Sequence, residues 1–141
     1  MMRIKVVVAD DDARVRGALI ALLRTDRRFA VVAELADATT LLETVRRTEP
    51  DVVLLDVRMP GGGVEGARAL QGGPPVVIVA ISAETSPAVV ADMVRAGANG
   101  YLAKGHLDAG LPDSVVRCVN GEVLLAVPTA SQALRRLTHV Y

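Results

Sequence analysis

The stretch RIKVVVADDDARVR, residues 3–16, begins as an apolar run and ends in three consecutive aspartates, after which a helical pattern starts. The apolar part has the β-branched content of a buried strand. Three adjacent carboxylates repel one another, which raises the cost of keeping all of them ionised. Asp12 stands where a helix cap belongs and is expected to cap the helix that follows. Asp10 and Asp11 therefore need a neutralising partner elsewhere in the fold.

The alternation of strand and helix patterns continues along the chain. Three of the apolar runs are nearly continuous in Val, Ile and Leu, which is typical of parallel strands covered by helices on both faces. We therefore predict an α/β fold, a single doubly wound, flavodoxin-like domain of five βα units, with a parallel five-stranded sheet in the order 2-1-3-4-5. The expected strands are 4–9, 29–35, 51–56, 75–82 and 100–103, and the expected helices are 13–25, 38–49, 64–71, 86–97 and 111–121.

Composition limits what this domain can do. The chain has 141 residues, 51% of them hydrophobic, which suits one domain with a substantial core. Its 16 basic and 16 acidic residues cancel, so direct binding of DNA through an overall positive field is disfavoured. A single cysteine, Cys118, excludes an internal disulfide, and the N-terminus has no secretory signal pattern. The longest uncharged apolar stretch, residues 74–82, is too short to span a bilayer, so we expect a cytoplasmic protein without membrane contact.

Polar residues stand at the carboxyl ends of the expected strands. Asp10 and Asp11 end the first strand, Asp56 ends the third, Ser82 ends the fourth, and Lys104 follows the fifth. In an open parallel sheet, ligands bind beyond the carboxyl ends of the strands, where the strand order reverses. With the first and third strands as neighbours, the three carboxylates are expected to meet in one crevice, flanked by a hydroxyl and an ammonium group.

This set of side chains predicts phosphoryl chemistry. Clustered carboxylates need a cation, and a small set of oxygen ligands that leaves room for water and phosphate suits Mg²⁺. Asp56, on the central strand, is then the expected nucleophile, which would form an aspartyl phosphate. Lys104 supplies positive charge and Ser82 a hydrogen-bond donor for the phosphoryl oxygens. Any one of these aspartates alone could be a plain cap or turn former, but five positions that all match strand ends favour a site.

The motifs PDVVLLDVRMPGGGVEG, residues 50–66, and GANGYLAK, residues 97–104, resemble the receiver domain of two-component response regulators, in its NarL/FixJ (LuxR-type) branch. The resemblance covers roughly residues 3–120 and includes the acidic pair, Asp-x-x-Met-Pro, Ser-Ala and the lysine in order. It implies that Asp56 accepts a phosphoryl group from a sensor histidine kinase.

The same resemblance assigns further roles. The acidic pair and Asp56 would bind Mg²⁺ together with the main-chain carbonyl of Arg58. Ser82 and Tyr101 would form a switch pair, in which Ser82 moves toward the phosphoryl group and Tyr101 turns inward behind it. The output face would consist of the fourth helix, the fifth strand and the fifth helix. Apart from this self-phosphorylation and its reversal, the chain is not expected to be an enzyme.

Two positions depart from the family pattern. Gly105 follows Lys104 where receivers commonly have proline, so the loop is expected to be looser. Arg58 and Glu84 flank the phosphorylation site, and a contact between them is expected to screen it partly. The glycines of residues 60–66 lack the Gly-Lys-Ser/Thr ending of a phosphate-binding loop, so we interpret them as a flexible connection.

The end of the chain predicts a second segment. Residues 1–121 would form the receiver, and residues 122–141 resemble the linker of NarL/FixJ-type regulators, with a helix starting near Pro128. Those regulators continue into a helix-turn-helix DNA-binding domain, which is absent from this chain. We therefore favour a receiver fragment of a transcription regulator over a stand-alone receiver that acts on a protein partner.

Two functional alternatives to the phosphorylation switch remain open from the sequence. A degenerate receiver would act only through protein contacts, and an aspartyl-nucleophile phosphatase would usually have a second carboxylate at the position of Arg58.

The apolar residues of the fourth helix either support dimerisation on phosphorylation or lie in the core; they are Val89, Val90 and Met93. His106, His139 and Cys118 have no ligand-like or activating neighbours in sequence, so they are interpreted as structural.

Overall fold

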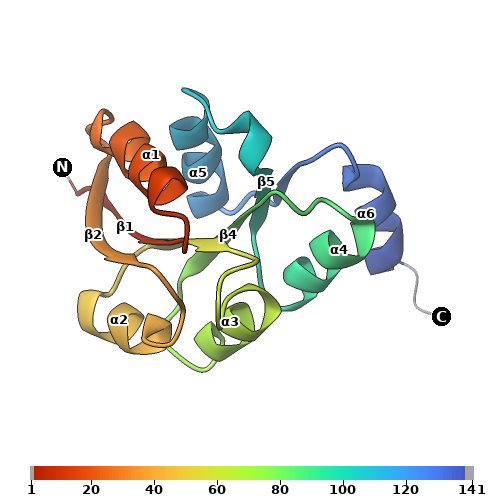
Figure 1. Cartoon of the computed structure of the whole chain (residues 1–141), viewed down its shortest axis with the longest axis horizontal. Coiled ribbons are helices and arrows are strands. Elements are labelled where there is room, and N and C mark those ends of the chain that lie inside the picture. Colours follow the sequence, from red (N-terminus) through yellow and green to blue (C-terminus); the bar gives the residue numbers. More distant parts are fainter. Residues whose placement is uncertain (1, 139–141) are drawn as a thin grey trace.

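Six parallel strands form one sheet in the order β2-β1-β3-β4-β5-β6. A computed structural model describes residues 2–138 of the chain (Figure 1). The strands are β1 Ile4–Ala9, β2 Phe29–Leu35, β3 Val52–Asp56, β4 Val77–Ser82, β5 Gly100–Ala103 and β6 Leu124–Ala126. The helices are α1 Ala13–Arg24, α2 Leu41–Thr48, α3 Gly63–Leu70, α4 Pro87–Arg95, α5 Leu111–Val119 and α6 Ala130–Thr138, with a 3₁₀ turn, η1, at Lys104–His106.

Helices cover both faces of the sheet. Helices α1 and α5 lie on one face, and α2, α3 and α4 lie on the other, where α6 packs beside α4 (Figure 1). The buried side chains divide accordingly into two clusters: Val6 and Val8 of β1 pack toward α1 and α5, whereas Val7 and Ala9 pack toward the opposite layer. Because successive side chains of a strand point to opposite faces, nearly continuous apolar runs are what a doubly covered sheet requires.

The predicted α/β class, the parallel sheet and the order of the first five strands are confirmed. The predicted number of five strands was wrong. A sixth strand, β6, pairs in parallel with β5 in the segment that we had interpreted as a linker. This edge strand has only three residues and none of them is fully buried, so it is shorter and less buried than the central strands, although its sequence is apolar. The additional helix begins at Ala130, two residues after the expected start.

Capping residues begin two of the helices, and the cap by Asp12 was expected. The Asp12 carboxylate accepts hydrogen bonds from the main-chain N–H groups of Arg14 (2.9 Å) and Val15 (3.4 Å) at the start of α1. Ser86 caps α4, with Pro87 as its first residue. Both arrangements satisfy N–H groups that have no partner within the helix.

The apolar residues of α4 belong to the core rather than to an open face. Val90 and Met93 are fully buried, and Val89 is half-buried against the same cluster. Ala133 of α6 is buried in that cluster as well. The alternative of core packing therefore holds for Val90 and Met93, and dimerisation on phosphorylation stays a prediction. Within residues 2–138, no helix is both long and apolar enough to cross a membrane.

Candidate functional site

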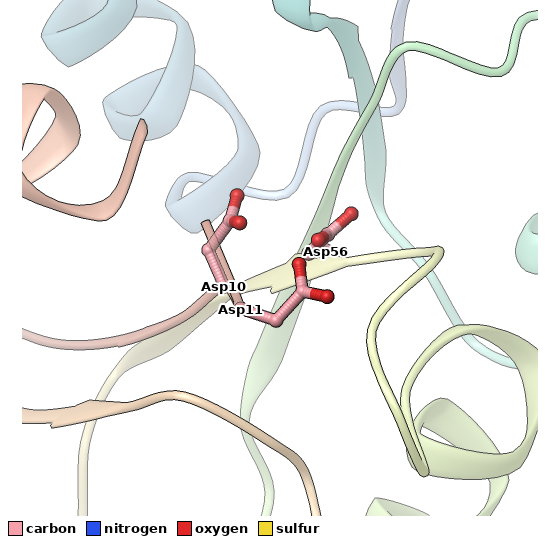
Figure 2. Close-up of side chains that lie close together, drawn as sticks. All are labelled: Asp10, Asp11 and Asp56. Atoms are coloured by element: carbon pink, nitrogen blue, oxygen red, sulfur yellow. The ribbon is translucent and has the colours of Figure 1, made fainter. Parts of the chain in front are cut away.

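Three carboxylates meet at the carboxyl end of the two central strands. Asp10 and Asp11 directly follow β1, and Asp56 is the last residue of β3, which pairs in parallel with β1. One carboxylate oxygen from each residue lies within 4.8 Å of the others, and Figure 2 shows the side chains gathered at these strand ends. Asp10 and Asp56 are almost completely buried, whereas Asp11 is exposed. The expected convergence of these residues is confirmed.

Lys104, the residue directly after β5, completes the cluster. Its Nζ lies 3.1 Å from Oδ2 of Asp10 and 3.4 Å from Oδ2 of Asp56. Burial lowers the pKa of Lys104, but the pairing with Asp10 and Asp56 outweighs this effect, so the pKa lies above its usual value. The lysine is therefore a permanent positive charge between the two buried carboxylates.

One ammonium group does not satisfy this much buried negative charge. Oδ2 of Asp10 and Oδ2 of Asp56 are buried and accept no hydrogen bond within residues 2–138, although Lys104 is within ion-pair distance. Burial, together with the charge of Asp10, raises the pKa of Asp56 to about 6, even though the N–H of Arg58 favours the ionised form. Buried carboxylate oxygens that accept no hydrogen bond, in a set of hard donors, are suited to a small divalent cation, so these residues fit Mg²⁺.

The loop after β3 holds Asp56 in place. The main-chain N–H of Arg58 donates a hydrogen bond to Oδ1 of Asp56 (3.1 Å). A Cβ atom added at Gly62 would lie 2.6 Å from the carbonyl oxygen of Asp56, and one at Gly63, where φ is +59°, would lie 2.6 Å from the carbonyl oxygen of Val57. These glycines, which we interpreted as a flexible connection, therefore allow the loop to pack closely against the end of β3.

Ser82 and Tyr101 both contact the main chain of Glu84. Ser82 is fully buried at the end of β4, and its Oγ accepts a hydrogen bond from the N–H of Glu84 (2.9 Å). Tyr101 is also fully buried, and its hydroxyl donates to the carbonyl oxygen of Glu84. Burial raises the pKa of Tyr101, which keeps this hydroxyl protonated as a donor. The inward position of Tyr101 is thus present in the unmodified chain, whereas its movement on phosphorylation stays a prediction.

The expected contact between Arg58 and Glu84 is confirmed. The Nη2 atom of Arg58 lies 3.4 Å from Oε2 of Glu84, at the exposed edge of the site. The role of the Arg58 carbonyl as a metal ligand stays a prediction. Gly105 lies in η1, where the chain forms a short 3₁₀ turn after Lys104.

Sequence reasoning missed one residue beside the acidic pair. The guanidinium of Arg16 in α1 donates from Nη1 to the carbonyl oxygen of Asp10 (2.7 Å), and its Nε lies 3.6 Å from Oε1 of Glu34 in β2. Arg16 thereby joins α1, the acidic loop and β2. Nothing in the sequence distinguishes it from the other arginines of this helix, because the contact depends on how α1 packs.

The remaining candidate residues lie apart from the site. Cys118 is fully buried in α5, and burial raises the pKa of its thiol. The raised pKa disfavours the reactive thiolate. The side chain of His106 and the whole of His139 lie outside the described residues.

Comparison with known proteins identifies the same family. Residues 6–115 match the response regulator receiver domain. The chain is 31% identical over 134 residues to the transcriptional regulatory protein YxjL of Bacillus subtilis, an alignment that covers 94% of this chain and 62% of that protein. The chain spans about three fifths of the length of the curated relatives it matches.

Solved structures agree. The receiver domain of the response regulator NarL from Mycobacterium tuberculosis is 33% identical, with a TM-score of 0.82, over 86% of this chain and 100% of that chain. A LuxR-family two-component response regulator from Aurantimonas is 27% identical, with a TM-score of 0.87, over 98% of this chain and 100% of that chain. Together with the convergence of the acidic residues and the lysine, these matches show that the chain belongs to the response regulator receiver domain family and is a receiver domain of the NarL type.

Proposed function

We propose that this receiver takes a phosphoryl group from a sensor histidine kinase on Asp56 and that Mg²⁺ is required for the transfer. Receiver domains of response regulators interact with histidine kinases and bind Mg²⁺ at an acidic pocket, and in this chain Asp10, Asp11 and Asp56 form such a pocket. The observation that carries the proposal is the pair of buried, unsatisfied oxygens on Asp10 and Asp56 beside Lys104.

The chain's own groups account for most of the proposed chemistry. An ionised oxygen of Asp56 attacks phosphorus, the bond from phosphorus to the imidazole nitrogen of the kinase breaks, and that nitrogen keeps the electron pair. The metal supplies charge that neutralises the phosphoryl oxygens and lowers the pKa of the Asp56 carboxyl. Lys104 is placed to bind a phosphoryl oxygen through its ammonium group, and Ser82 to donate a hydrogen bond to another. Asp10, Asp11 and the carbonyl oxygen of Arg58 are the proposed remaining metal ligands.

We further propose that the phosphoryl group acts on the switch pair. Ser82 and Tyr101 lie on the adjacent strands β4 and β5 and share Glu84 as a hydrogen-bond partner. A phosphoryl group that attracts the Ser82 hydroxyl would therefore act on the same loop that binds Tyr101. The equilibrium between two positions of this loop would shift toward the position in which the phosphoryl group has the more favourable contacts. The size of the shift would equal the difference in interaction free energy between the two positions.

The output is proposed to be control of transcription. The relatives are named as transcriptional regulators, and this chain corresponds to about three fifths of their length, so DNA would be contacted by a domain outside this sequence. Such a regulator would act in the cytoplasm. A homodimer formed on phosphorylation stays a prediction, and it must use a surface other than Val90 and Met93, which are buried.

The test is incubation with Mg²⁺ and acetyl phosphate, followed by measurement of the intact mass. We expect the addition of one phosphoryl group, which is lost in Asp56→Asn and when EDTA replaces Mg²⁺. No addition to the wild type under these conditions would favour a degenerate receiver that works by protein contact alone. Receiver domains are generally not catalytic enzymes. Sustained hydrolysis of an added phosphomonoester would therefore contradict the proposal and indicate a phosphatase.

A further inference from the structure

The C-terminal segment touches the loop that follows β4. Thr129, the residue before α6, donates a hydrogen bond from its hydroxyl to the main-chain carbonyl of Thr85. Thr85 lies between β4 and α4, 44 residues earlier in the chain. Figure 1 shows α6 beside α4, with the chain from β4 reaching α4 at this end of the molecule.

The same loop carries the partner of the proposed switch residues. Glu84 donates its N–H to Ser82 and accepts the hydroxyl of Tyr101 at its carbonyl oxygen. Glu84 and Thr85 are consecutive, so one peptide unit joins the residue held by Ser82 and Tyr101 to the residue held by Thr129. The position of residues 83–86 is therefore set from two sides, by the strands of the phosphoacceptor site and by α6.

Helix α6 is itself well anchored and gives Thr129 a fixed support. Ala133 is fully buried in the core cluster that contains Val90 and Met93 of α4. At the other end of α6, Nη2 of Arg95 in α4 donates to the carbonyl oxygen of Arg136 (2.7 Å). Helix α6 is thus held at its start, middle and end, and a shift of the loop would break the contact at its start.

We propose that Thr129 is a positioning residue for the phosphoacceptor site, an inference that rests on the proposed function of Asp56. Through the carbonyl of Thr85, it holds residues 83–86 where Ser82 and Tyr101 both face inward. Since Tyr101 already has this inward position in the unmodified chain, α6 stabilises the loop position that the phosphoryl group needs. Docking of α6 and modification of Asp56 therefore strengthen each other, as coupling between two sites requires.

The test compares binding of a phosphoryl analogue, beryllofluoride with Mg²⁺, to the wild type and to Thr129→Val by titration calorimetry. Valine keeps the shape of threonine but removes the hydroxyl. We expect the dissociation constant to rise about three- to tenfold, the range for loss of one hydrogen bond, and to return to the wild-type value in Thr129→Ser. The matched control is Thr138→Val, because the Thr138 hydroxyl donates within α6, to the carbonyl of Leu134 (3.1 Å).

Hydrogen exchange of the unmodified protein gives a second readout. In Thr129→Val, amide exchange should become faster at residues 83–86, whereas Thr138→Val should leave these amides unchanged. If the wild type binds beryllofluoride and Thr129→Val binds it equally tightly, the positioning role is wrong while the function of Asp56 stands. If the wild type binds none, the proposed function fails and there is no phosphoacceptor site for Thr129 to position.

Discussion

Burial of the Asp56 carboxylate at the site disfavours its ionised form. The residue is 1% exposed, and burial raises its pKa from 3.8 to about 6. This value already includes a smaller upward contribution from the charge of Asp10 and opposing contributions from the N–H of Arg58 and the charge of Lys104. An ionised Asp56 therefore destabilises the metal-free fold. A cation bound at the site would reduce this destabilisation by neutralising the carboxylate charge.

The first prediction concerns the pH dependence of stability without metal. A carboxyl whose pKa is raised in the folded state stabilises the fold below its unfolded pKa, near 3.8, and this contribution is lost as the pH rises through about 6. Asp56→Asn should therefore raise the free energy of unfolding at neutral pH, by up to about 3 kcal/mol, with little gain near pH 4. Urea denaturation in EDTA at several pH values measures the difference.

Asp11→Asn is the matched control for this experiment, since Asp11 belongs to the same cluster but is exposed. It should change the stability much less. Mg²⁺ should stabilise the wild type and reduce the advantage of Asp56→Asn. An Asp56→Asn protein that is no more stable than the wild type at neutral pH would show that burial does not destabilise the ionised carboxylate.

The second prediction concerns the pair formed by Arg58 and Glu84. Their contact, 3.4 Å between Nη2 and Oε2, lies at the exposed edge of the site, and we expect it to screen Asp56 partly from water. Arg58→Ala should shorten the lifetime of the phosphorylated protein by a factor of up to about five, because an exposed ion pair contributes at most about 1 kcal/mol. Loss of label from the phosphorylated protein gives the lifetime. Glu84→Gln, which removes the charge but keeps the shape, should act in the same direction, and unchanged decay in both variants would exclude a screening role.

The chemical residues were predictable because a parallel sheet brings all its carboxyl strand ends to one edge. The acidic pair, Asp56 and Lys104 are far apart in the chain, yet each stands at the end of an apolar run that identifies a strand, so strand order alone predicts their meeting. Arg16 and Thr129 follow no such rule. Their hydrogen bonds depend on the packing of a helix against a loop, which leaves no pattern in the sequence.

At the scale of elements, the loop between β3 and α3 packs closely against the end of β3. Gly62 lies so close to the end of β3 that an added Cβ would be 2.6 Å from the carbonyl oxygen of Asp56 and 2.8 Å from Cγ of Met59. Met59 is buried, so neither neighbour can easily move away. The glycine run is required by this close approach, which the sequence alone cannot separate from simple flexibility.

The third prediction follows from this packing. Gly62→Ala should displace the loop, weaken the hydrogen bond from the Arg58 N–H to Asp56, and lower the free energy of unfolding by about 1–3 kcal/mol. Phosphorylation by acetyl phosphate should become slower.

Gly17→Ala in α1 is the control, because a Cβ there would meet no heavy atom of the described residues within 4 Å. That variant should be stabilised by about 0.5–1 kcal/mol, the usual gain of alanine over glycine inside a helix. Equal stability of the two variants would contradict the prediction.

At the scale of the whole molecule, the C-terminal segment is part of the receiver's own packing. Strand β6 extends the sheet beyond β5, and α6 covers α4, on the face that the family resemblance assigns to output. The boundary between residues 1–121 and 122–141 was drawn from the resemblance of the tail to a linker, and residues 122–138 are joined to the rest by strand pairing and by the buried Ala133. Such contacts form between segments distant in sequence, so a reading of local patterns does not reveal them.

The fourth prediction tests whether α6 is held by its buried face. Ala133 is fully buried against the cluster that includes Val90 and Met93, whereas the neighbouring Leu134 is 48% exposed. Ala133→Glu would bury an unpaired charge, so α6 should leave α4 and the protein should lose about 2–4 kcal/mol of stability. Leu134→Glu places the same charge on the exposed side of the same helix and should change stability by less than about 0.5 kcal/mol. Thermal unfolding, with hydrogen exchange over residues 130–138, separates the two variants. Rapid exchange of α6 in Ala133→Glu alone would show that this face holds the helix, and equal protection in both variants would show that the contacts of Thr129 and Arg95 suffice without it.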